Sequence, residues 1–150
     1  MDLILWRHAE AEEGGPDLER KLTAKGHKHA ARMAKWLQQR LPSKFIVLSS
    51  PAARARQTAA ALATSVKTAP SLAPDASAAQ MIEALDWPRR KGAVVLVGHQ
   101  PALGQVAAVL VSGKPGDWTI RKGALWWLTS RERDGDAQVV VRAVLAPEFI

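Results

Sequence analysis

The sequence predicts an α/β protein, a three-layer α/β/α sandwich with a mostly parallel central sheet and an antiparallel edge. Short apolar runs typical of strands alternate along the chain with segments of helical periodicity. Such alternation favours parallel strands joined by right-handed crossover helices. The last two strand-like runs surround the turn at Asp134-Gly135 with no helix between them, and this spacing predicts the antiparallel edge.

The strand assignments rest on apolar runs that are bounded by turn residues. The runs at 2–6 and 93–97 are hydrophobic almost throughout, which is typical of strands covered on both faces. The run at 67–69 is a short extended piece that precedes Pro70. The predicted strands are 2–6, 45–48, 67–69, 93–97, 125–129 and 139–145.

The helices are predicted from apolar residues that recur on one face and from their start and stop signals. Thr23 is a good N-cap for the first helix, and Pro42 ends it. A fourth helix follows Pro101 and places Leu103, Val106, Ala107 and Leu110 on one face. The other predicted helices are 53–65 and 77–85, and the first runs from about 23 to 41.

Length and composition limit the class of protein. A chain of 150 residues is expected to form one domain, 1–150, with a full core. It has no cysteine, which excludes disulfides, thiolate catalysis and cysteine-based zinc sites. No apolar run has the length of a signal peptide or a membrane span, so we expect a cytoplasmic protein without a membrane partner. The net charge of +7 favours anionic ligands or acidic partners.

Cationic and imidazole side chains follow three of the predicted strands. Arg7 and His8 come directly after the first strand, Arg54 follows the second, and His99 follows the strand at 93–97. In sheets of this kind, ligands bind beyond the carboxyl ends of the strands. We therefore expect these four side chains to converge on one anion.

This set of residues suits phosphoryl transfer without a metal ion. A histidine attacks phosphorus through one ring nitrogen when the other is fixed as a hydrogen-bond donor, usually to a backbone carbonyl. Arg7 and Arg54 supply planar donors that stay charged, and His99 adds one more donor to a phosphoryl oxygen. Ser49 or Ser50 could add a hydroxyl at the same edge.

Four stretches, taken in chain order, resemble motifs of the histidine phosphatase superfamily, which is phosphoglycerate mutase-like. Within it, the chain looks like the short SixA-type phosphohistidine phosphatases. Arg7-His8-Ala9 stands where the family has Arg-His-Gly, and Gly98-His99 resembles its Gly-His motif. The segment 20–26 resembles its Leu-Thr-x-x-Gly motif, and 50–58 resembles Ser-Pro-x-x-Arg-x-x-Gln-Thr.

The resemblance implies a role for each matched residue. His8 would be the nucleophile, Arg7, Arg54 and His99 would form the phosphate pocket, and Arg20 would be an outer phosphate or substrate contact. It implies no cofactor and no metal. The implied substrate is a phosphohistidine-bearing protein, either a histidine phosphotransfer domain or a sugar-transport phosphocarrier.

The chain departs from the family pattern in two places. Ala9 replaces the motif glycine, which would cost roughly 1 kcal/mol if the position needs a positive φ and little otherwise. Many larger relatives carry an acidic proton donor after the second helix, and the motif around Asp75 there is not matched. Asp75 and Glu10 are the possible proton donors. A missing acid favours phosphohistidine as substrate, because its imidazole leaving group has a conjugate acid with a pKa of about 6.5.

Two other functions compete with this interpretation. The first is hydrolysis of a small phosphomonoester, with Asp75 as the acid. The second is a non-catalytic module that binds through a basic helix face, although no nucleic-acid motif is recognised and no nucleic-acid partner is expected. That basic face consists of Lys25, Lys28, Arg32 and Lys35. Most such faces are simply solvated, and His27 and His29 on the same helix are expected to face solvent.

Overall fold

A computed structural model describes all residues, 1–150. It contains six strands, four α-helices and three short 3-10 turns. The strands are β1 (Asp2–Arg7), β2 (Phe45–Ser49), β3 (Lys67–Thr68), β4 (Ala93–Gly98), β5 (Leu125–Arg133) and β6 (Asp136–Leu145). The helices are α1 (Ala24–Gln38), α2 (Ala53–Ala60), α3 (Ala78–Leu85) and α4 (Ala102–Ser112), and the 3-10 turns are η1 (Asp17–Glu19), η2 (Pro70–Leu72) and η3 (Pro147–Phe149).

One six-stranded sheet in the order β3-β2-β4-β1-β5-β6 forms the centre of the molecule. The first four strands in this order pair in parallel, and β5 and β6 add an antiparallel edge. Because β4 lies between β1 and β2, the carboxyl ends of these three strands are neighbours. The predicted parallel sheet with an antiparallel edge is confirmed.

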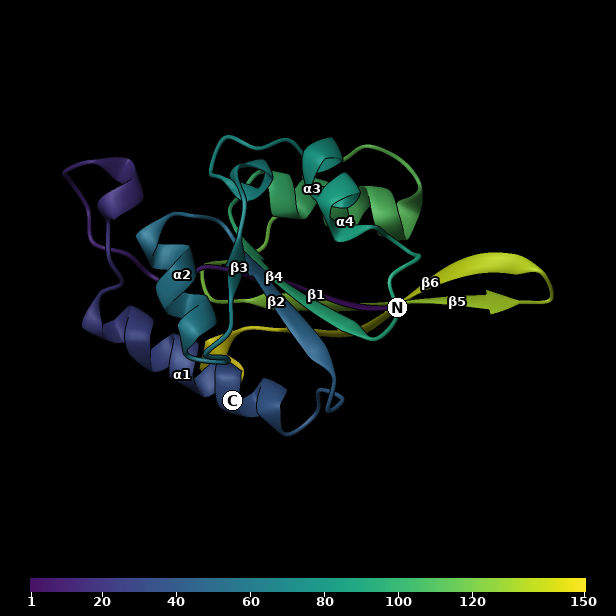
Figure 1. Cartoon of the computed structure of the whole chain (residues 1–150), viewed down its shortest axis with the longest axis horizontal. Coiled ribbons are helices and arrows are strands. Elements are labelled where there is room, and N and C mark those ends of the chain that lie inside the picture. Colours follow the sequence, from purple (N-terminus) through teal and green to yellow (C-terminus); the bar gives the residue numbers. More distant parts are fainter.

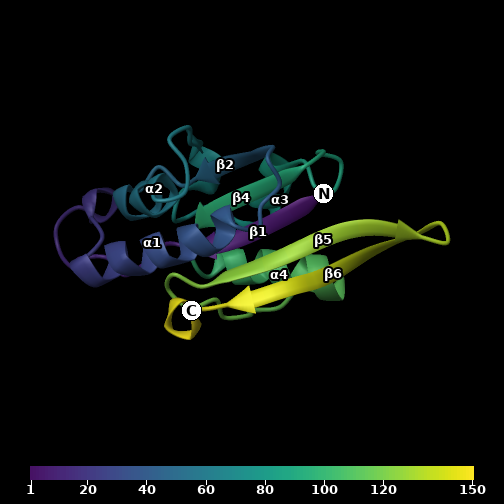
Figure 2. The same cartoon turned by 90° about the horizontal axis from the view of Figure 1, so that it is seen from below.

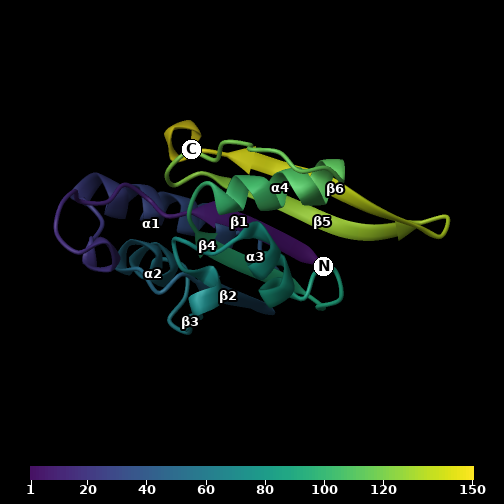
Figure 3. The same cartoon turned by 90° about the horizontal axis from the view of Figure 1, so that it is seen from above.

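Helices cover both faces of the sheet, as Figure 1 shows with α1 below it and α3 and α4 above. Helix α2 packs on the same face as α1, since its Ala55 and Ala59 share an apolar cluster with Met33 of α1. Figure 2 looks onto the α1 face, where Met33 and Leu37 pack against Ile4 and Val95 of the central strands. Figure 3 looks onto the α3 and α4 face. There a second apolar cluster includes Leu3, Leu5, Leu96, Met81 and Leu103. Successive side chains of β1 and β4 point alternately into the two apolar clusters, so both faces of the sheet are buried and the protein has three layers.

The adjacent tryptophans of β5 divide between the two faces, as side chains of a strand must. Trp127 is buried and packs edge-on against Trp36 of α1, with ring centroids 6.2 Å apart. Trp126 faces the other layer and lies 5.4 Å from Trp118. Both rings thus contribute to covered faces of the sheet.

Several element boundaries differ from the prediction. Helix α2 ends at Ala60 rather than Ser65, because Leu62 turns into the core and the chain must reach β3 beside β2. The hairpin is longer than predicted, because Ser130–Arg133 pair with Asp136–Val139 beyond the sheet. These polar residues carry no apolar alternation, so the pattern could not reveal them. Helix α1 also ends three residues earlier, at Gln38, with a hydrogen-bonded turn before Pro42.

The longest helix, α1, has 15 residues, and no helix combines the length and apolar character that crossing a bilayer requires.

Candidate active site

The four predicted phosphate-binding residues lie at one edge of the sheet. Arg7 ends β1 and His8 follows it, while His99 follows β4 and Arg54 lies in the first turn of α2. Backbone bonds align these strand ends, because the His8 N–H donates to the Gly98 carbonyl over 3.1 Å. The rings of His8 and His99 are 5.0 Å apart, and His99 contacts Arg54. The structure thus places His8, Arg54 and His99 together, with Arg7 next to His8 at the end of β1.

The His8 ring is held by a bond to its own chain. Its Nδ1 lies 2.8 Å from the carbonyl oxygen of Ala9. Since a carbonyl only accepts, Nδ1 carries the proton, and Nε2 of the neutral ring keeps a free lone pair. Burial and the nearby cations Arg54, Arg7 and Arg20 lower the pKa of His8 to about 4, although the bond to Ala9 opposes this shift. His8 is therefore a neutral potential nucleophile near pH 7.

His99 is also buried, and its two neighbours set its tautomer. Nδ1 lies 3.4 Å from Nη2 of Arg54, which can only donate, so Nδ1 accepts. Nε2 then carries the proton and donates to Oγ of Ser50 over 2.7 Å. Burial, followed by the charges of His8 and Arg54, lowers the pKa of His99 to about 3. A phosphate at this position would favour the imidazolium form, which could donate from both nitrogens.

Both predicted arginines present buried N–H groups. The Nε atoms of Arg7 and Arg54 are buried and make no hydrogen bond within the protein. Arg7 is fixed by a 2.9 Å bond from Nη1 to the carbonyl of Ile120. Burial lowers the pKa of Arg7, but an arginine remains charged at any physiological pH. Each arginine therefore keeps one N–H group that has no acceptor within the protein.

The orientation of Arg54 depends on Asp17, a residue that the sequence analysis did not select. Nη1 of Arg54 donates to the backbone carbonyl of Asp17 over 2.7 Å, and Nη2 donates to its carboxylate over 3.2 Å. The same carboxylate pairs with Arg20 at 3.1 Å. Slight desolvation disfavours its charge, but the hydrogen bonds and charges of Arg54 and Arg20 outweigh this and lower its pKa. Asp17 lies on η1 within an irregular loop, where no periodic pattern marks it.

The motif residues after Arg54 connect α2 to the loop that follows His8. Oγ1 of Thr58 accepts from the backbone N–H of Ala9 over 3.1 Å. Gln57 accepts from the N–H of Leu22 over 2.8 Å. Ala9 is buried and does not have a positive φ, so its replacement of the motif glycine introduces no backbone strain. The Gln-Thr pair therefore shapes the site loop.

Arg20 and the two possible proton donors occupy different surroundings. Arg20 bonds to Asp17 and to the carbonyl of Glu12, at the outer side of Arg54. Glu10 lines a cleft together with Arg7 and accepts from the Thr23 hydroxyl over 3.2 Å. Asp75 is exposed between η2 and α3, and it makes no hydrogen bond or ion pair with the site residues. Of the two carboxyl groups, Glu10 shares a cleft with Arg7.

The histidines of α1 differ from each other. His27 is exposed, as expected, but His29 is only half exposed and lines the same cleft as Arg7. The expectation that both face solvent is therefore wrong for His29, because the loop before β5 packs against it at Gly123. No group of three or more His, Asp or Glu side chains is arranged to hold a metal ion.

Comparison with known proteins places the chain in a family. A model of the histidine phosphatase superfamily (branch 1) matches residues 3–77, which include Arg7, His8 and Arg54. The chain belongs to the histidine phosphatase superfamily. An uncharacterised protein from Picosynechococcus sp. is 36% identical over 126 residues, which cover 77% of this chain and 76% of that protein.

Solved structures of superfamily members share the whole fold. The protein histidine phosphatase SixA in complex with tungstate aligns with a TM-score of 0.84 and 24% identity, over 99% of each chain. A protein provisionally assigned as the phosphohistidine phosphatase SixA from Nakamurella multipartitia aligns with a TM-score of 0.81 and 25% identity, over 97% of this chain and 95% of that one. The predicted phosphoglycerate mutase-like fold and the resemblance to SixA are confirmed.

Proposed function

We propose that the chain is a phosphatase that removes phosphate from phosphohistidine on a protein, through a covalent phospho-His8 intermediate. The observation that carries this proposal is the bond between His8 Nδ1 and the Ala9 carbonyl. It leaves Nε2 with a lone pair in a pocket that contains two arginines and a second histidine. The similarity to two SixA structures supports the same chemistry.

In the first step, Nε2 of His8 attacks the phosphorus atom of the substrate. A bond forms between Nε2 and phosphorus while the bond between phosphorus and the substrate imidazole breaks. Negative charge grows on the phosphoryl oxygens, and the guanidinium groups of Arg7 and Arg54 stabilise it. His99 gains a proton as the dianionic phosphoryl group arrives, and it donates from Nδ1 in place of accepting from Arg54.

The leaving group explains why the site works without a strong acid. A departing imidazole has a conjugate acid with a pKa of about 6.5, so it leaves as a neutral ring after taking one proton from solvent or His99. An alkyl alkoxide would need a well-placed carboxylic acid. Asp75 makes no contact with the site, and Glu10 accepts a bond from Thr23 and faces Lys25 at 3.8 Å. These surroundings favour a phosphoramidate over an alkyl phosphate.

In the second step, water attacks the phosphorus of phospho-His8. The bond between phosphorus and Nε2 breaks, its electron pair returns to Nε2, and inorganic phosphate leaves. The bond from Nδ1 to the Ala9 carbonyl holds the ring in the same orientation throughout. The cycle therefore regenerates neutral His8, and it uses no cofactor. Histidine phosphotransfer domains and sugar-transport phosphocarriers are the proposed substrates.

The intermediate can be trapped directly. A histidine phosphotransfer domain carrying ³²P-phosphohistidine is mixed with the protein and quenched within milliseconds in alkaline detergent, which preserves phosphohistidine. We expect transient label on the wild-type chain, none on His8→Ala, and release of labelled phosphate only by the wild type. His27→Ala is the matched control, because His27 is an exposed histidine outside the site, and it should acquire label normally.

Two results would contradict the proposal. Near wild-type turnover of the phosphoprotein by His8→Ala would exclude the covalent mechanism. Fast hydrolysis of an alkyl phosphate that is lost in Asp75→Asn, with no turnover of the phosphoprotein, would identify a small-molecule phosphomonoesterase instead.

A further inference from the structure

A polar cleft lies next to the phosphate pocket, and Arg7 is the one residue of its lining that the proposed chemistry uses. It has a volume of about 600 Å³ and no hydrophobic residue in its lining. Arg7 lines it, and Lys25, His29, Arg121 and Lys122 contribute further basic groups. The cleft is formed by the start of α1, the loop before β5 and the C-terminal turn η3. Figure 1 shows the C-terminus, which η3 precedes, beside α1 on the lower side of the sheet.

The cleft is fixed in position relative to the nucleophile. The N–H of Gly123 donates to the carbonyls of Arg7 and His8 over 3.2 and 3.1 Å. Arg7 in turn donates to the carbonyl of Ile120. The loop that carries Arg121 and Lys122 is thus bonded directly to the backbone of the catalytic strand end. A group bound in the cleft would hold a constant offset from a phosphoryl group on His8.

The charges of the cleft are available to a partner. Its two acidic residues, Glu10 and Glu148, pair with Lys25 and Arg121 respectively. Both pairs are solvent-exposed, and exposed pairs contribute little to stability, so an incoming carboxylate can replace them. Lys122 makes no ion pair or side-chain hydrogen bond. The cleft therefore carries a surplus of positive charge beside Arg7.

The shape and the neighbouring surface indicate a protein rather than a small ligand. Small-molecule sites are mostly apolar and enclose most of the ligand, whereas this cleft is open and lined only by polar and charged residues. An apolar depression next to it shares Thr119 and Arg121 and includes Trp126, Val144 and Phe149. Phe149 is 76% exposed. Exposed aromatic groups beside a charged cleft are typical of protein interfaces.

We propose that the cleft receives acidic side chains that flank the phosphohistidine on the surface of the substrate protein. This inference rests on the proposed function and adds the feature of the substrate that the enzyme recognises. Lys25, Arg121 and Lys122 bind the carboxylates, and Phe149 packs against an apolar group beside them. The contacts lie outside the phosphate pocket, so they select the protein without taking part in phosphoryl transfer.

The test compares two substrates in one charge-reversal variant, Lys122→Glu. The protein substrate is a phosphorylated histidine phosphotransfer domain with acidic residues around its histidine, and the small substrate is para-nitrophenyl phosphate, whose phenolate leaves without a strong acid. At low salt we expect kcat/KM for the protein to fall about tenfold, mostly through KM, and to recover partly in high salt. Turnover of para-nitrophenyl phosphate should change less than twofold.

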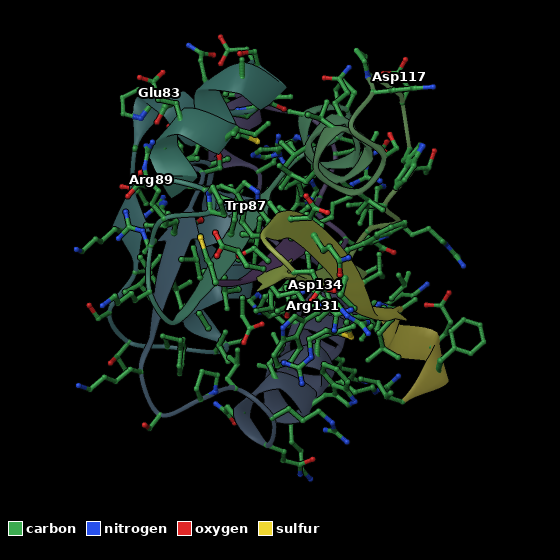
Figure 4. The ribbon with its side chains drawn as sticks, turned by 90° about the vertical axis from the view of Figure 1, so that its right-hand side faces the viewer. Glu83, Trp87, Arg89, Asp117, Arg131 and Asp134 are labelled. Atoms are coloured by element: carbon green, nitrogen blue, oxygen red, sulfur yellow. The ribbon has the colours of Figure 1, made fainter.

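Arg131→Glu is the matched control, because it makes the same change in net charge at the other end of the molecule. Figure 4 looks onto that end, where Arg131 lies near the tip of the β5–β6 hairpin. The control should leave both substrates unaffected. Equal losses in the two variants would overturn the proposal in favour of overall charge, and an equal loss for both substrates in Lys122→Glu would overturn it in favour of a disturbed phosphate pocket.

The outcomes separate this inference from the function on which it rests. If the wild type hydrolyses both substrates and Lys122→Glu changes neither, the docking cleft is wrong and the phosphatase proposal stands. If the wild type hydrolyses neither substrate, the proposed function fails and the cleft proposal fails with it. Thermal melts of both variants confirm that each one is folded under the assay conditions.

Discussion

Contacts with Asp17, a single residue on a surface turn, fix the orientation of Arg54. The arginine is buried, and two of its nitrogens donate to the carbonyl and the carboxylate of Asp17. Arg20 holds the other side of the same carboxylate. A buried guanidinium without such partners could adopt several rotamers, and the proposed phosphate clamp would then lose much of its effect on the transition state.

Asp17→Asn tests this arrangement with almost no change in size. The variant keeps the backbone carbonyl bond and loses the charged oxygen, so Arg54 is held less firmly. We expect kcat/KM for a phosphohistidine protein to fall about tenfold, with a decrease in kcat. Glu19→Gln, an exposed change on the same turn, should retain wild-type kinetics. Identical rates for Asp17→Asn and the wild type would show that Asp17 does not position the clamp.

The sequence predicts the four central residues but not the residues that hold them. Arg7, His8, Arg54 and His99 each follow a strand-like run, so topology alone brings them to one edge. Asp17 lies in a loop of glycines, proline and acids, where contacts depend on how the loop folds over α2. Ser50 and Thr58 belong to a motif that the sequence shows, but their bonds to the His99 ring and to the Ala9 N–H could not be read from it. Close packing of irregular segments is therefore what sequence patterns leave open.

Among the elements, α1 approaches the site loop unusually closely. Thr23 caps the helix by accepting from the Gly26 N–H over 2.9 Å, and its own N–H donates to the carbonyl of Glu10. A Cβ atom at position 26 would lie only 2.1 Å from that carbonyl oxygen. The glycine of the Leu-Thr-x-x-Gly motif is thus needed for close backbone contact, and its φ is not positive.

Gly26→Ala gives a prediction whose sign opposes helix propensity. In an exposed helix interior, the change from glycine to alanine stabilises by about 1 kcal/mol. Here the methyl group must push α1 away from Glu10, so we expect a net destabilisation of roughly 1–3 kcal/mol in urea unfolding. Gly135→Ala is the control. Gly135 lies in the hairpin turn with a positive φ and no atom within 4 Å of the added methyl group, so this substitution tests backbone strain without a close contact. An increase in stability for Gly26→Ala would contradict the close contact.

Element boundaries show what decides between propensity and tertiary structure. The alanine-rich stretch after Ala60 favours a longer helix, yet Leu62 leaves the helix to pack in the core and the chain turns toward β3. Strand β1 pairs with β5 only as far as Thr129, but the pairing of β5 with β6 continues beyond it through charged residues. Local pattern identifies each buried element, and long-range packing sets where it stops.

At the scale of the whole molecule, burial of two histidines near three arginines links the active site to stability. The protein carries a net charge of +7, and its site concentrates cations at one edge of the sheet. The pKa values of His8 and His99 are lowered to about 4 and about 3, mainly by burial. Both rings are neutral in the folded protein, whereas in the unfolded chain they titrate near their ordinary value of about 6.5.

This difference predicts that the protein loses stability in mild acid. Between about pH 6.5 and pH 4 the unfolded chain binds more protons than the folded one. The free energy of unfolding therefore increases with pH in this window, and it decreases as the pH falls from about 6.5 to about 4. We expect a loss of about 1–2 kcal/mol per histidine between pH 7 and pH 5, measured by urea unfolding at each pH. His8→Gln should reduce the slope, because glutamine does not titrate, while His27→Gln should keep it. Equal wild-type stability at pH 5 and pH 7 would mean that burial does not lower the pKa values of the two rings. His8 would then be protonated in mild acid and would lack its free lone pair.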